Sequence, residues 1–164
     1  MARKVFYSFH FDNDFFRTQQ VRNMNSFEGQ SFCSANAWEE VKQEGDAAVE
    51  KWIDDNLKGK SCLVVLVGSQ TANRKWVKKE IEKAWNAGKG VLGVRINKLK
   101  DTDGLSGTAG ENPFSQFSLQ NGKNMSSIAP LKSPAGATSK EAYASIRDNL
   151  EAWIEEAIEA RSNA

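Results

Sequence analysis

Apolar residues along the chain fall into short runs of the kind that form strands. The segments 4–10, 62–67 and 90–96 are rich in aliphatic, aromatic and β-branched side chains, which is typical of strands. The segment 62–67 is apolar at every position and therefore predicts a central strand that is buried on both faces. A loop rich in Ser, Asn and Gly covers 25–36, and a short strand near Phe32 is the one element that we expect inside it.

Four other segments follow a helical pattern and alternate with the strands. Gly59 and Gly88 stand where the C-terminal caps of two of these helices are expected. The last helix is preceded by Thr138-Ser139-Lys140-Glu141, which has the pattern of a capping box. The four predicted helices cover residues 15–24, 46–57, 75–87 and 138–161.

This alternation predicts an α/β domain with a parallel sheet of four or five strands covered by helices on both faces. A length of 164 residues fits a single domain, 1–164. Gly, Ser, Asn and Pro dominate 98–137 without periodicity, so we expect a long irregular insertion that packs over the carboxyl end of the sheet and acts partly as a lid. Ligands of such sheets bind outside the carboxyl ends of the strands, which selects the segments after Phe9, Val67 and Ile96.

Composition excludes several classes of function. Lys and Arg number 22 and Asp and Glu 21, so the charge gives no argument for a general nucleic-acid binder. No apolar run approaches the roughly 20 residues of a membrane span, and the N-terminal residues do not resemble a signal peptide. Two cysteines and the single His10 do not suffice for a disulfide framework or a multi-histidine metal site. We expect a cytoplasmic protein that binds no metal, nucleic acid or membrane.

Two segments resemble phosphate-binding motifs in their letters alone. The run from Gly88 to Gly93 matches G-x-G-x-x-G, but it follows a helix and opens a strand, whereas the dinucleotide fingerprint follows a strand and opens a helix. Gly59-Lys60-Ser61 has the ending of a P-loop, but Asp54 stands where the first glycine is required. Neither segment predicts nucleotide binding.

The helix after the apolar strand carries the candidate chemistry. At about 100° per residue, Val77, Ile81 and Ala84 share its buried face. Glu80 lies on the flank of that face, and Glu82 points toward solvent. Glu80 is therefore the acid that we expect to be partly buried, at the mouth of a pocket.

Helix geometry alone leaves two interpretations of Glu80 open. In the first, Glu80 faces a pocket together with Trp76, its neighbour one turn earlier. In the second, it is a flank residue that pairs with Lys79 or Lys83, and geometry alone favours this reading.

The stretch from Val64 to Ile81 resembles the core of TIR domains, in which an apolar strand ending in Ser leads to a helix with W-x-x-x-E. The segment 4–10, followed by Asp14, resembles the first strand and loop of the same fold. The resemblance covers residues 3–115. Four segments resemble more specifically the TIR-like proteins of the bacterial Thoeris anti-phage system. They are Ser8-Phe9-His10, Gly68-Ser69-Gln70-Thr71, Asn73-Arg74 and Asn112-Pro113-Phe114.

The resemblance implies a flavodoxin-like, three-layer TIR-type sandwich and an NAD-consuming enzyme, with NAD as substrate and no cofactor. Catalytic TIR domains cleave the nicotinamide–ribose bond. Those of Thoeris make a cyclic ADP-ribose isomer or a related nucleotide signal that activates a separate effector. The catalytic glutamate of the family maps onto Glu80. Self-association on activation is a further feature that the resemblance implies.

The chemistry agrees with a single catalytic carboxylate. Nicotinamide in NAD is already a cationic leaving group, so its departure requires no general acid. A carboxylate beside the ribose stabilises the positive charge that develops in an oxocarbenium-like transition state. Glu80 therefore suffices without a metal or a catalytic histidine.

Eight residues are candidates for substrate binding, and some of them lie at or just after the ends of predicted strands. Aromatic residues among them would form an apolar, stacking wall, although Trp38 is equally compatible with packing against Trp52. The serine hydroxyls would bond ribose or phosphate, or else a loop backbone. His10 fits a positioning role or a structural one, and one residue is included by resemblance alone. The candidates are Ser8, Phe9, His10, Phe11, Trp38, Ser69, Trp76 and Asn112.

Two other functions compete with NAD cleavage. One is a non-catalytic TIR-like interaction module, and the other is a hydrolase or transferase that acts on another N-glycoside, such as a nucleoside. A Glu80 that faces a pocket favours either enzyme, whereas a Glu80 held in a surface ion pair favours the module.

Overall fold

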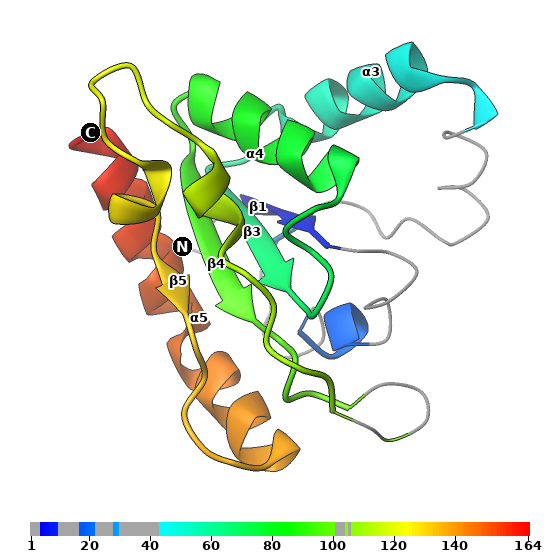
Figure 1. Cartoon of the computed structure of the whole chain (residues 1–164), viewed down its shortest axis with the longest axis vertical. Helices are drawn as coiled ribbons and strands as arrows, with labels where there is room; N and C mark the ends of the chain where they lie inside the picture. Colours follow the sequence, from blue (N-terminus) through cyan, green and yellow to red (C-terminus); the bar gives the residue numbers. More distant parts are fainter. Residues whose placement is uncertain (1–3, 10–16, 22–27, 30–42, 101–103, 105) are drawn as a thin grey trace.

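The computed structural model describes residues 4–9, 17–21, 28–29, 43–100, 104 and 106–164. Its centre is a five-stranded parallel sheet with the order β2-β1-β3-β4-β5. The expected parallel α/β sheet is therefore confirmed (Figure 1). The strands are β1 (Lys4–Ser8), β2 (Glu28–Gly29), β3 (Cys62–Val67), β4 (Gly90–Arg95) and β5 (Leu131–Lys132).

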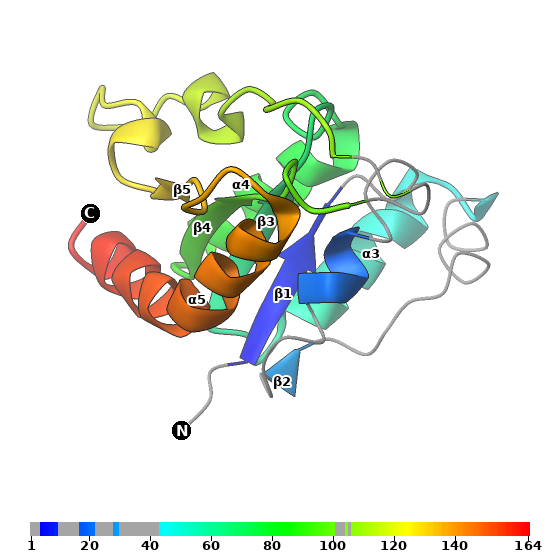
Figure 2. The same ribbon diagram turned by 90° about the horizontal axis from the view of Figure 1, so that it is seen from below.

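Helices cover the two faces of the sheet and make three layers (Figure 2). Helices α3 (Asp46–Leu57) and α4 (Lys75–Asn86) pack on one face. Helix α5 (Ser139–Ser162) and the helical residues 17–21 pack on the other. Within the part of the chain that the structure describes, no helix has the length and apolar character needed to cross a membrane.

The central strand β3 supplies both halves of the core. All six of its side chains are fully buried, as the continuous apolar run predicted. Because successive strand residues point to opposite faces, Leu63 and Val65 join the cluster under α3 and α4, while Val64 and Leu66 join the cluster under α5.

The predicted helix ends are confirmed where the structure describes them. Gly59 and Gly88 both have φ of +76°, the left-handed conformation that favours glycine after a helix. At the start of α5, Thr138 Oγ1 accepts a hydrogen bond from the Glu141 backbone N–H at 3.2 Å, which satisfies one free donor of the first turn. Phe32 lies outside the described residues.

The segment 98–137 is more ordered than its sequence predicts. It contains two short 3₁₀ helices, η1 (Pro113–Gln116) and η2 (Met125–Ser127), before strand β5. Phe114 is fully buried against the α3 and α4 side of the core. Strand β5 has only two residues, which are too few to show an alternation of apolar residues, so the sequence did not predict it.

Glycines of the rejected G-x-G-x-x-G match make room for packing. A Cβ added at Gly90 would lie 2.9 Å from the backbone of Ile158 in α5. A Cβ added at Gly93 would lie 2.8 Å from Leu131 Cδ1 and 3.0 Å from Phe114 Cε2. The spacing of these glycines thus reflects contacts of β4 with its neighbours rather than a phosphate site.

Candidate active site

The strand order reverses its direction between β1 and β3. The chain passes from β1 to β2 on one side and then returns to β3 on the other. In a sheet of order 2-1-3-4-5, this reversal marks the point outside the carboxyl ends where ligands bind. Ser8 ends β1 and is paired in register with Val65 of β3, so the two strands deliver their following loops to this point.

Glu80 directs its carboxyl at the end of β1. The side chain projects from the sheet-facing side of α4 and is only 6% exposed. The Ser8 hydroxyl donates a hydrogen bond to Glu80 Oε1 at 3.3 Å. Burial raises the pKa of the Glu80 carboxyl well above its ordinary value of 4.5, and the hydrogen bond from Ser8 offsets part of this rise. Burial therefore shifts the balance of this carboxyl toward its protonated form.

The interpretation of Glu80 as a surface ion-pair residue is wrong. Lys79 Nζ lies 3.3 Å from Glu50 Oε1 and Lys83 Nζ lies 2.9 Å from Asp54 Oδ1. Both lysines thus pair with acids of α3, and neither pairs with Glu80. The carboxyl is also more deeply buried than the helical pattern predicted.

The loop between β3 and α4 is held by a residue that the sequence analysis did not select. Thr71 is fully buried, and its Oγ1 accepts a hydrogen bond from the Gly68 backbone N–H at 2.8 Å. Ser69, half-buried, lies within the same turn. A threonine shortly after a strand is a common local signal for such a side-chain–backbone turn, and it points to Thr71.

The segment 98–137 packs over this carboxyl end of the sheet, as expected. A Cβ added at Gly110 would collide with Gly68 O, so the two backbones are in close contact. Arg95 Nη2 donates to Gly110 O at 3.2 Å, and Gln116 Nε2 donates to Ala72 O at 2.6 Å. These contacts fasten the segment to the loop that leads into α4, and its opening as a lid stays a prediction.

Asn112 has a local structural role. Its Oδ1 accepts a hydrogen bond from the Phe114 backbone N–H at 2.9 Å and caps η1. A substrate contact by this residue stays a prediction.

The aromatic candidates are not gathered around Glu80 in the described structure. Phe9 is half-buried and packs against the core on the α5 side of the sheet, whereas Glu80 approaches from the α4 side. His10, Phe11 and Trp38 lie outside the described residues. The alternative partner of Trp38, Trp52, packs edge-on against Phe6 with ring centroids 5.9 Å apart.

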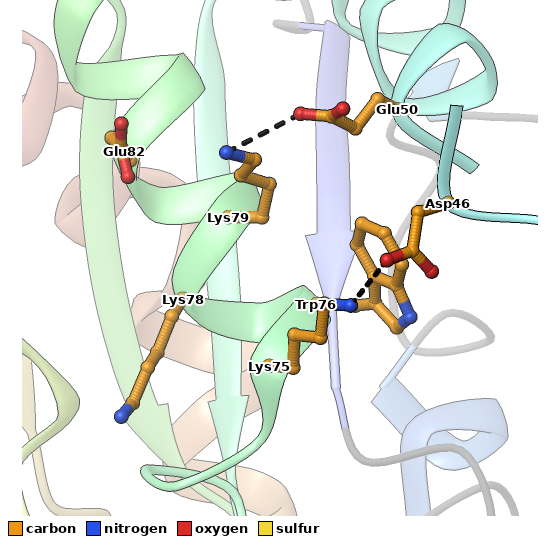
Figure 3. Close-up of a pocket in the computed structure, with 7 residues that line it drawn as sticks. All are labelled: Asp46, Glu50, Lys75, Trp76, Lys78, Lys79 and Glu82. Carbon is orange, nitrogen blue, oxygen red and sulfur yellow. Dashed lines mark hydrogen bonds and ion pairs between the residues drawn. The ribbon is translucent and has the colours of Figure 1, made fainter. Parts of the chain in front are cut away.

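Trp76 lines a groove of about 310 Å³ between α3 and α4 (Figure 3). Lys75 Nζ lies 4.7 Å from the centre of its ring. Glu80 does not line this groove. The three lysines and three acids that line the groove balance in charge, and two ion pairs already bridge it. We therefore place the candidate site at Glu80 rather than in this groove. The lining residues are Asp46, Glu50, Lys75, Trp76, Lys78, Lys79 and Glu82.

No metal site is found within the described ranges, where no group of three or more His, Cys, Asp or Glu side chains is arranged to hold an ion.

Comparison with known protein families decides the family. Residues 6–101 match the model of the family described as "Thoeris protein ThsB, TIR-like domain", which is more than half of the chain. The chain belongs to this ThsB family. The matched range includes Ser8, Ser69 and Glu80, whereas Asn112 lies beyond it.

A ThsB relative agrees with this assignment. A protein of Bacillus cereus (strain MSX-D12) named "Putative cyclic ADP-D-ribose synthase ThsB1" is 38% identical over 126 residues. The match covers 73% of this chain and 65% of the relative, so the chain spans slightly less than two thirds of that protein's length.

Proposed function

We propose that this ThsB family member cleaves the bond between nicotinamide and ribose in NAD and converts the remaining nucleotide into a cyclic ADP-ribose-type product. One observation carries the proposal: Glu80 is a buried carboxyl at the carboxyl end of the sheet, and no described cation pairs with it. The name of the Bacillus cereus relative, a cyclic ADP-D-ribose synthase, supports the same reaction class.

A cationic substrate changes the charge of this carboxyl. In the free protein, burial favours the protonated form of Glu80. The pyridinium ring of NAD brings a positive charge whose attraction to a carboxylate is strong in a site of low dielectric. Binding therefore lowers the pKa of Glu80 and releases its proton, and the carboxylate becomes available where the substrate needs it.

The bond then breaks without a general acid. The C1′–N bond gives its electron pair to the ring nitrogen, and nicotinamide leaves as a neutral molecule. The Glu80 carboxylate stabilises the positive charge on the ribose as it develops. Either water or a nucleophilic atom of the same nucleotide then bonds to C1′ and releases a proton. Exclusion of water by the segment over the sheet end favours the cyclic product.

Membership in the Thoeris ThsB family supports the cellular part of the proposal. The product acts as a diffusible nucleotide signal that activates a separate effector in antiviral defence, and the enzyme works in the cytoplasm. Self-association on activation belongs to the same proposal.

Product analysis tests the reaction. The protein is incubated separately with NAD and with nucleosides, under conditions that include extract of phage-infected cells, and the products are identified by mass spectrometry. We expect nicotinamide and a cyclic ADP-ribose isomer from NAD only. Cleavage of nucleosides but not NAD would favour a different N-glycoside substrate, and a folded protein that consumes neither would favour an interaction module.

A further inference from the structure

Ser8 has a position that a substrate-binding serine would not need. Its side chain is only 1% exposed, and its hydroxyl points at Glu80 rather than into solvent. Among the described residues, this is the one hydrogen bond that the Glu80 carboxyl receives. The hydrogen bond of the Ser8 hydroxyl is therefore already used by the Glu80 carboxyl in the protein without a ligand.

We propose that Ser8 is a positioning residue for Glu80, which holds the carboxyl at the end of β1 and stabilises the charged form that a cationic substrate requires. This inference rests on the proposed cleavage of NAD for its purpose, but the contact itself is testable without that activity.

The length of the contact fits this role. Hydroxyl hydrogen bonds are usually about 2.7–2.8 Å long, and those to a charged oxygen are about 2.5–2.7 Å. The 3.3 Å separation of Ser8 Oγ and Glu80 Oε1 is long for either kind. The bond has room to shorten when the carboxyl becomes charged, as catalytic hydrogen bonds often do when substrate binds.

The strand fixes Ser8 where the carboxyl arrives. Ser8 pairs in register with Val65 of the fully buried β3. Phe6, two residues earlier on the same face of β1, packs under α3 and α4. The Cβ of Ser8 therefore points to the face of the sheet on which Glu80 lies.

Three lysines of α4 are engaged elsewhere. Lys75, Lys79 and Lys83 each form an ion pair with an acid of α3, and Arg74 at the start of α4 is exposed. His10, Asp12 and Asp14 follow Ser8 in the sequence and lie outside the described residues. A test based on pH must therefore separate Glu80 from these groups, and a double-mutant cycle does so.

The first experiment measures urea unfolding of the wild type, Ser8→Ala, Glu80→Gln and the double variant at about pH 5 and about pH 8. Loss of the hydroxyl should lower the urea midpoint more at the higher pH, because ionised Glu80 then lacks its donor. In the Glu80→Gln background, this pH dependence should disappear. Ser61→Ala, at the opposite end of β3, is the control and should act equally at both pH values.

Equal destabilisation by Ser8→Ala at both pH values, with or without Glu80, would overturn the proposal and make Ser8 an ordinary buried serine. Ser8→Cys, which is close in size and a weaker donor, provides the same comparison if Ser8→Ala does not fold.

The second experiment uses NAD. Ser8→Ala should lower kcat/KM roughly ten- to hundredfold, the usual effect of losing a hydrogen bond to a charged group, mainly through kcat. The acid limb of the pH profile should move to higher pH, and Ser8→Thr should restore much of both. An unchanged pH profile would contradict the positioning role. If the wild type does not consume NAD, the proposed function fails while the unfolding cycle still decides the Ser8–Glu80 contact.

Discussion

The two sides of helix α4 treat charge in opposite ways. On the side toward α3, Lys75, Lys79 and Lys83 form a ladder of three ion pairs with acids one turn apart on α3 (Figure 3 shows the first two). Every carboxylate of this ladder has a cation and contact with water. On the side toward the sheet, Glu80 is almost completely buried, no cation among the described residues pairs with it, and a single described hydroxyl bonds to it.

This difference separates the charges of the ladder from the carboxyl that we propose as catalytic. Exposed ion pairs stabilise a protein by only about 0–1 kcal/mol, and the ladder aligns two helices. A buried carboxyl without a cation is unfavourable for folding, so its presence calls for another reason. The cationic substrate that we propose would supply one.

The largest expected effect comes from removing the charge of Glu80. Glu80→Gln keeps the shape of the side chain, so the fold should survive. The rate of nicotinamide release should fall by roughly a hundredfold or more, as for other single electrostatic stabilisers. Glu82→Gln, on the exposed side of the same helix, is the matched control and should keep wild-type rates. Wild-type turnover by folded Glu80→Gln would remove Glu80 from the mechanism.

A second substitution tests how the segment 98–137 is attached over the carboxyl end of the sheet. Gly110→Ala introduces a Cβ that collides with Gly68 O, so it should destabilise the protein by about 1–3 kcal/mol. Hydrogen exchange across 112–117 should become faster. Ala109→Ser, at the exposed neighbour, should change neither quantity. Unaltered exchange in Gly110→Ala would show that the segment is not fastened through this contact.

The pH dependence of stability should reveal the buried carboxyl of Glu80. The pKa of Glu80 is raised in the folded protein above its ordinary value of 4.5, so the unfolded chain loses this proton at lower pH than the folded one. Stability from this group therefore falls as pH rises from about 4.5 through the raised value. Glu80→Gln should gain stability relative to the wild type over that range. Parallel curves of urea midpoint against pH would indicate an ordinary carboxyl.

The smallest effect is expected on the opposite side of α4. Glu50→Gln removes the partner of Lys79, and both side chains are more than a third exposed. Thermal unfolding should show a loss of about 0.2–1 kcal/mol that shrinks in high salt. NAD turnover should stay at wild-type level, and a large loss of turnover would mean that the ladder and the site are coupled.

Periodicity predicted the long elements well and the short ones poorly. The apolar run of β3 and the capping box of α5 have local signals, and both are confirmed. Strands β2 and β5 have two residues each, too few to show alternation. Their places depend on pairing with β1 and β4, which are distant in the sequence.

The candidate site was predictable in part. Helical geometry identified Glu80 as the acid closest to the buried face, because that property belongs to one helix. Its contact with Ser8 joins residues 72 positions apart, and no local pattern specifies it. Thr71 offered a weak turn signal, and the capping role of Asn112 became visible only with η1 in place.

The most direct test of this account is an NMR titration of the Glu80 carboxyl carbon, assigned by comparison with Glu80→Gln. The titration is run with and without a hydrolysis-resistant NAD analogue that keeps the cationic nicotinamide. The account predicts a pKa well above 4.5 in the free protein and a fall when the analogue binds. An ordinary pKa in the free protein, or a raised one that the bound cation leaves unchanged, would contradict it.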